Sequence, residues 1–219
     1  MSVSFKNLFG LRPLSPQLSE YISTLEQSIS TSQPVSASPE IKSYSDAVYF
    51  NYFSLGLSIL FSPDDGYKPK TGLKLNDLKT ENLSLDGIYI YNVPQKSADR
   101  AKGTSTRTAE LAFSTYPAMP FNLSIDVFKQ DKDGKTIERP SQLQVNTNTS
   151  GKDFVRALGE PDRKGGGAGP SSGSIGIWCE WSKDGVMVEF GGDEAKGPQA
   201  WERGKDAVWK IITIFNPTT

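Results

Sequence analysis

The sequence predicts an α+β protein that is mainly antiparallel sheet with few short helices and that contains two related three-stranded repeat units. Three observations predict this fold. Apolar and polar residues alternate on both sides of the Lys183-Asp184-Gly185 turn in residues 175–190, a pattern typical of a half-buried hairpin. Residues 49–61 form a similar hairpin earlier in the chain. Each hairpin is followed by a similar third strand, at residues 88–92 and 212–216, and both of these strands end in Asn.

The two hairpins can be aligned over their whole length. The alignment places Phe50 against Trp178, Tyr52 against Glu180 and Gly56 against Gly185, with one extra residue in the later turn. Three strands in the same order at both ends of a chain indicate that one unit has been duplicated. The alternative is that β-rich sequences resemble one another by composition.

A chain of 219 residues can fold as one domain or as two small units that share an interface. We expect a first repeat unit with an N-terminal helix at residues 1–95 and a second repeat unit at residues 151–219. Residues 96–150 would form a connecting loop and extra strands between them.

Two helices are predicted. The first spans residues 16–29, where Ser15 precedes Pro16 as an N-cap. Its apolar residues recur at three- and four-residue spacings, at Leu18, Tyr21, Ile22, Leu25 and Ile29. The second helix is short, with Asp153 in its first turn and Gly159 as its C-cap.

The middle of the chain predicts further antiparallel strands. Residues 110–119 form one expected strand, which ends at two prolines. Residues 121–130 and 135–145 form another two, joined by a hairpin turn at residues 131–134. The loop at residues 163–176 is rich in Gly and Ser and leads into the later hairpin.

Composition excludes several classes of function. The chain has no His, so histidine-dependent triads and dyads are excluded, and with a single Cys a structural zinc site is excluded as well. A net charge of -1 argues against nucleic acid as a partner. One Cys and the absence of a signal-peptide pattern predict a cytoplasmic location, with membrane association only indirect or weak.

The candidate reactive groups each have a simpler structural interpretation. Cys179 shares a strand face with Ile177 and Trp181, so we interpret it as an inert core cysteine. Glu180 and Glu189 could form a carboxylate pair of the kind used in glycoside hydrolysis, but charged residues on the outer face of a strand are usually solvated. We therefore expect no catalytic residue, no metal site and no cofactor.

Several phrases resemble a known repeat. FVRALGEP, the strand VMVEF and the closing strand VWKIITIF resemble the repeat unit of β-lactamase-inhibitor-protein-like and SmpA-like folds. The phrase YFNYFSLGLSILF resembles a repeat of the eukaryotic phagosome-assembly-factor-like family. The first hairpin lacks the L-G-x-P turn, and a chain with one Cys cannot form the inhibitor's disulfides. The resemblance implies a non-catalytic tandem-repeat protein that binds protein partners, with a link to autophagy and membrane trafficking.

The expected function is therefore that of an intracellular protein-interaction module that presents aromatic sheet faces and loops. Strand alternation places Trp178 opposite Cys179, and the alignment adds Phe50 and Tyr52, so these three residues are predicted to form a partner-binding surface or a surface between the repeats. The alternative is a cystatin-like or nuclear-transport-factor-like cone that binds or hydrolyses a small ligand with carboxylates.

Overall fold

Antiparallel strands make up most of the regular structure in the computed structural model, which describes residues 4–29, 38–93, 112–130, 134–167 and 176–217. The chain divides into two units, Val3–Ala118 with Thr213–Asn216, and Met119–Ile212. The predicted α+β class with mainly antiparallel sheet and few short helices is confirmed. None of the helices within the described ranges is long and apolar enough to cross a membrane.

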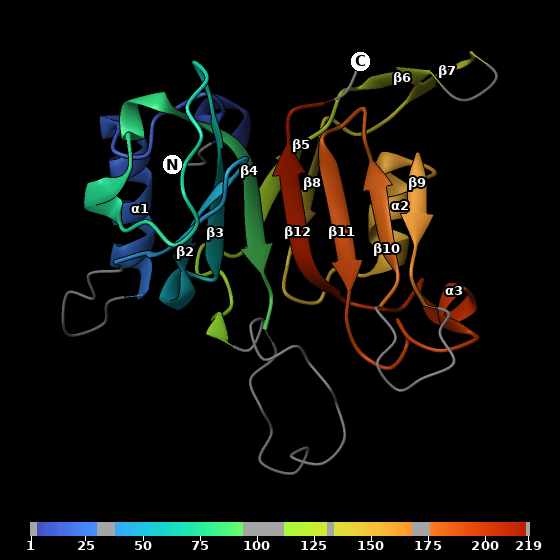
Figure 1. The fold of residues 1–219 in the computed structure, drawn as a ribbon. Helices are drawn as coiled ribbons and strands as arrows, with labels where there is room; N and C mark the ends of the chain where they lie inside the picture. Colours follow the sequence, from blue (N-terminus) through green and yellow to red (C-terminus); the bar gives the residue numbers. More distant parts are fainter. Residues whose placement is uncertain (1–3, 30–37, 94–111, 131–133, 168–175, 218–219) are drawn as a thin grey trace, which may run out of the picture. The chain divides into compact units, whose positions relative to one another are not determined.

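The first unit places one helix against a four-stranded meander (Figure 1). Helix α1 (Pro16–Ile29) has the predicted bounds and buries Leu18, Tyr21, Ile22 and Leu25. The sheet order is β1 (Glu40–Ser43), β2 (Val48–Tyr52), β3 (Leu57–Pro63) and β4 (Leu83–Tyr91), and each strand is antiparallel to the next. Short 3-10 turns complete the unit: η1 (Phe5–Leu8), η2 (Phe53–Leu55), η3 (Leu75–Asp77) and η4 (Thr80–Asn82).

The core of the first unit lies between α1 and one face of its sheet. Buried residues alternate along the three long strands, at Val48, Phe50, Leu57, Ile59, Phe61, Ile88 and Ile90. Phe50 and Phe61 contact each other across β2 and β3 with ring centroids 4.9 Å apart. Tyr52, at the end of β2, lies near Glu26 of α1 and so belongs to the same face.

The second unit repeats this order of elements. Helix α2 (Gly151–Leu158) precedes an edge strand, β9 (Arg163–Gly165), which is followed by the hairpin β10 (Trp178–Trp181) and β11 (Val186–Phe190). The next strand is β12 (Trp209–Phe215), of which the residues up to Ile212 belong to this unit. Phe154 of α2 contacts Trp181 and Phe190, with ring centroids 6.3 and 6.0 Å apart. Figure 1 shows α2 against one face of the sheet near β10. Its contacts with Trp181 and Phe190 identify this face as the one that carries the buried side chains of β10 and β11.

Helix α2 ends as the sequence predicts. A capping box joins Ser150 and Asp153 at its start, and the backbone N–H of Gly159 donates to Val155 at its end. Gly159 has φ +80°, a conformation that favours glycine. A short helix that the sequence did not predict, α3 (Ala200–Arg203), lies in the connection between β11 and β12.

The strands predicted between the two repeat units differ from expectation. The described part of the predicted strand at residues 110–119 is irregular and has no strand pairing. The next two predicted strands are each broken in two, giving β5 (Phe121–Ser124) with β8 (Gln142–Val145), and β6 (Phe128–Gln130) with β7 (Thr136–Glu138). The break follows from Pro140, which has no N–H to donate to a ladder.

Candidate functional site: the open sheet faces

The second unit has a sheet face that is opposite α2. Trp178 and Glu180 of β10 lie on it, with Glu189 and Met187 of β11 directly across from them. Lys210 of β12 joins the same face, because its Nζ lies 3.8 Å from a carboxylate oxygen of Glu189. All five side chains are half-buried. We call these five residues the Trp178 face.

The indole ring of Trp178 packs against the edge strand β9. Gly165 of the edge strand β9 lies opposite Trp178, and a Cβ atom at Gly165 would be 2.7 Å from a carbon of the indole ring. The absence of a side chain on Gly165 therefore lets the indole lie against β9. A large aromatic group fixed in this way loses little conformational freedom when a partner binds.

The two carboxylates of the Trp178 face lie at diagonal positions on the β10–β11 pair. Each is next to its own cation. A guanidinium nitrogen of Arg163 lies 3.5 Å from Glu180, and Lys210 lies beside Glu189. Because Arg163 is largely exposed, the ion pair that it forms contributes little stability. The face therefore presents an aromatic ring among charges of both signs.

Of the three predicted site residues, only Trp178 lies on an open face. Phe50 is 1% exposed and Tyr52 is 7% exposed, and both lie in the core of the first unit. Their predicted role at an external surface is therefore wrong. The error comes from the alignment of the two hairpins.

The paired strands give the correct alignment. The last pair of the first hairpin is Tyr52 with Leu57, and the last pair of the second is Trp181 with Val186. Both turns thus contain four residues, 53–56 and 182–185, and neither has an extra residue. In this register Trp178 is equivalent to Tyr49. A shift of one residue moves every side chain of a strand to the opposite face, so the predicted alignment selected core residues.

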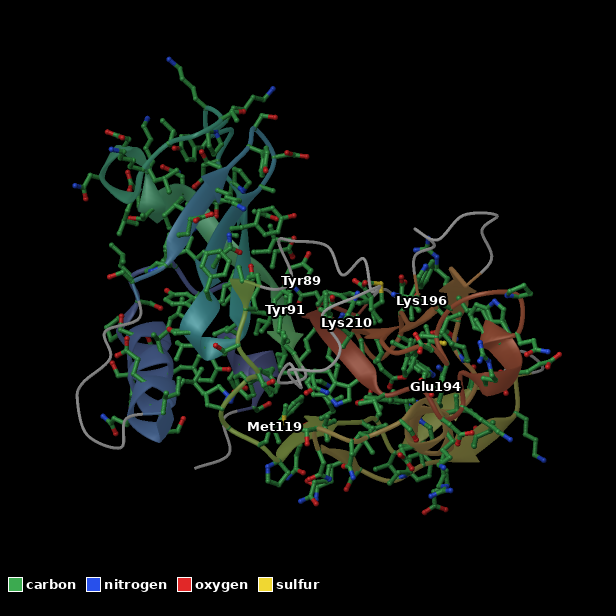
Figure 2. The ribbon with its side chains drawn as sticks, turned by 90° about the horizontal axis from the view of Figure 1, so that it is seen from below. Tyr89, Tyr91, Met119, Glu194, Lys196 and Lys210 are labelled. Atoms are coloured by element: carbon green, nitrogen blue, oxygen red, sulfur yellow. The ribbon has the colours of Figure 1, made fainter. Side chains whose placement is uncertain are left out.

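The equivalent face of the first unit carries tyrosines. Tyr44, Tyr49 and Tyr89 form a row in which neighbouring ring centroids are 6.2 Å apart. Tyr49 lies on β2 and Tyr89 on β4, so the two rings meet above β3. Figure 2 labels Tyr89 together with Tyr91, which follows it on the same face of β4. The predicted alignment paired Phe50, and not Tyr49, with Trp178, so it did not indicate this row of tyrosines.

A buried ion pair, which sequence reasoning missed, supports the second unit. Two guanidinium nitrogens of Arg139 donate to the two carboxylate oxygens of Asp184 at 2.9 and 2.8 Å. Arg139 also donates to the carbonyl oxygens of Leu158 and Asp126. The pair joins the base of the β6–β7 ribbon to the β10–β11 turn and to the end of α2. The sequence pattern predicts Asp184 only as a turn residue.

Cys179 and the possible metal ligands are the remaining candidate groups. Cys179 is buried, as predicted, and burial raises the pKa of its thiol to about 11. A thiol with such a pKa is almost entirely protonated at neutral pH and is a poor nucleophile. No group of His, Cys, Asp and Glu side chains that could hold a metal ion occurs in the part of the chain that the structure describes. Comparisons of the chain with protein-family models, with curated proteins and with solved structures each find no match.

Proposed function

We propose that the protein is a non-catalytic protein-interaction module whose main contact is the Trp178 face. The observation that supports this most is the position of Trp178, which is half-buried on a sheet face opposite α2 and lies against Gly165. Tryptophan is the residue most enriched among the anchors of protein interfaces. It combines a large apolar area with an N–H that can donate to a partner.

The surroundings of Trp178 fit a protein partner. Glu180, Glu189 and Lys210 supply charge of both signs beside the indole, and Met187 supplies an adaptable apolar contact. An apolar anchor with a charged rim is the usual anatomy of a protein interface. We further propose that the protein is cytoplasmic and acts in autophagy or membrane trafficking. The single Cys supports the location, and the resemblance to the phagosome-assembly-factor-like family supports the pathway.

Affinity capture with matched variants tests this function. The tagged wild-type chain, Trp178→Ala and Trp201→Ala would each be used to capture proteins from the cytosol. Trp201 is a suitable control because it is 43% exposed and lies on α3, outside the Trp178 face. We expect a partner that the wild type and Trp201→Ala retain and that Trp178→Ala loses. A set of captured proteins that is the same for all three would refute the proposal.

A second variant separates binding from catalysis. Carboxylates are the acid-base groups that a chain without His offers on this face, so Glu180→Gln with Glu189→Gln would abolish any turnover located there. An interaction surface should tolerate the same double change with a modest loss of affinity, because ion pairs at an interface rim contribute little. Turnover that is present in the wild type and absent in this variant would replace the proposal with a catalytic one.

A further inference from the structure

Residues 113–116 lie across the end of the first unit at which the β2–β3 turn and the last residues of β4 meet. The backbone N–H of Ser114 donates to the carbonyl of Phe53 at 2.8 Å, and that of Tyr116 donates to the carbonyl of Tyr91 at 2.9 Å. The segment is thus bound through its main chain, in the manner of an extended peptide on a recognition domain.

The first two side chains of the segment differ in exposure. Phe113 is 8% exposed, and its ring stacks on Tyr91 with a centroid distance of 3.8 Å and an interplanar angle of 3°. The ring of Phe53 also contacts that of Phe113, with the two centroids 4.6 Å apart. Ser114, the next residue, is exposed.

The third and fourth residues make specific polar contacts. The hydroxyl of Thr115 donates to the carbonyl of Val93 at 2.7 Å, and it accepts from the N–H of the same residue at 3.1 Å. Tyr116 is 3% exposed, and its hydroxyl lies 2.9 Å from the hydroxyl of Tyr21 on α1. The groove therefore makes specific contacts with an aromatic residue, Phe113, and with a tyrosine three positions later, Tyr116.

Gly56 makes room for the bound backbone. A Cβ atom at this position would lie 2.3 Å from the carbonyl oxygen of Ser114 and 2.6 Å from the nitrogen of Tyr116. Gly56 also has φ +55°, which favours glycine. Because Gly56 has no side chain, the backbone of residues 114–116 can lie directly against the backbone of the groove.

We propose that this groove, formed by Tyr21, Phe53, Gly56, Tyr91 and Val93, is a peptide-binding site that residues 113–116 occupy in cis. Its ligand in trans is an extended segment of a partner protein with an aromatic residue three positions before a tyrosine. Such a segment competes with residues 113–116 and displaces them. This site goes beyond the Trp178 face, and because it lies on the other unit either proposal can fail alone.

A labelled peptide tests the site directly. The peptide LAFSTYPA reproduces residues 111–118, and its binding to the full chain would be followed by fluorescence anisotropy. The wild type should bind it weakly, because a tethered segment competes at an effective concentration on the order of millimolar. The variant Phe113→Ala with Tyr116→Ala empties the groove and should bind the peptide at least about tenfold more tightly. A peptide with Ala at both of these positions should not bind.

Two further measurements apply if the variant Phe113→Ala with Tyr116→Ala, called the emptied variant below, is unstable. The peptide should raise the melting temperature of that variant in a concentration-dependent way, because a ligand that binds the folded state stabilises it. Added to the emptied variant, which has no Tyr116 to compete, Tyr21→Phe should weaken the binding of LAFSTYPA but not of LAFSTFPA, since only the first peptide can use the hydroxyl contact. Equal affinity of wild type and variant for LAFSTYPA, or the absence of any thermal stabilisation by it, would overturn the proposal.

Discussion

Replacing Asp184 by Asn should strongly destabilise the second unit. The side chains of Asp184 and Arg139 are 2% and 5% exposed, and Lys129 lies 3.6 Å from the same carboxylate. The change keeps the shape of the side chain but removes the negative charge, so a buried guanidinium loses its counter-ion. Removal of one partner from a buried ion pair costs about 3–5 kcal/mol. For a domain of this size that is a fall in melting temperature of roughly 10 °C or more.

Thermal and urea unfolding, followed by circular dichroism, measure this effect. Asp162→Asn is the matched control, because Asp162 is 29% exposed and its carboxylate lies 3.5 Å from Lys129. It also accepts from the backbone N–H of Lys183 at 3.4 Å, a contact that the Asn oxygen can keep, so the change should cost less than about 1 kcal/mol. Arg139→Met combined with Asp184→Asn should cost clearly less than the sum of the two single changes, since no charge is then left without its partner. A cost below about 1 kcal/mol for Asp184→Asn, or full additivity in the double variant, would refute the reasoning.

Three other predictions follow from the buried and capped groups. Burial raises the pKa of Tyr52 and Tyr116 to about 12, whereas the unfolded chain loses these protons near 10. The contribution of these two groups to the free energy of unfolding should therefore be fully present below about pH 10 and should be lost as the pH rises towards 12. Melting temperatures measured across this range should fall, and they should fall less in Tyr116→Phe. Asp153→Ala removes the capping box of α2 and should cost about 1 kcal/mol in urea unfolding, and an unchanged unfolding midpoint would contradict the role of this cap. Cys179 should react with iodoacetamide only after denaturation, and rapid labelling of the native chain would contradict its burial.

The parts of the fold that sequence predicted are those with strong local signals. The predicted bounds of helix α1 are correct at both ends, because the spacing of its apolar residues and Pro16 at its start are strong signals. The two hairpins, β4 and β12 were found from period-2 alternation. The edge strands β1 and β9 were missed, because each pairs on one side only and has at most four residues. The duplication of the unit stays a prediction.

The site could be predicted only in part, for reasons that are also physical. Alternation along β10 correctly separated Trp178 from Cys179 and Trp181, because that information lies within one strand. The equivalence of Trp178 with Tyr49 depends on the length of a turn, and one wrongly placed gap reversed the faces of β2. The Arg139–Asp184 pair joins residues 45 positions apart, and nothing in the local pattern of either residue indicates the other.

The dissociation constant of Trp178→Ala for the captured partner, measured beside its melting temperature, tests the central claim most directly. Trp178 is half-buried and lies over a glycine, so we expect its loss to cost less stability than the roughly 3–5 kcal/mol of an emptied aromatic core site. As an interface anchor it should contribute about 1–3 kcal/mol to binding, which raises the dissociation constant by about 5- to 150-fold, while Trp201→Ala leaves it unchanged. An unchanged dissociation constant for Trp178→Ala, or a loss of folding that accounts for the loss of binding, would contradict the account.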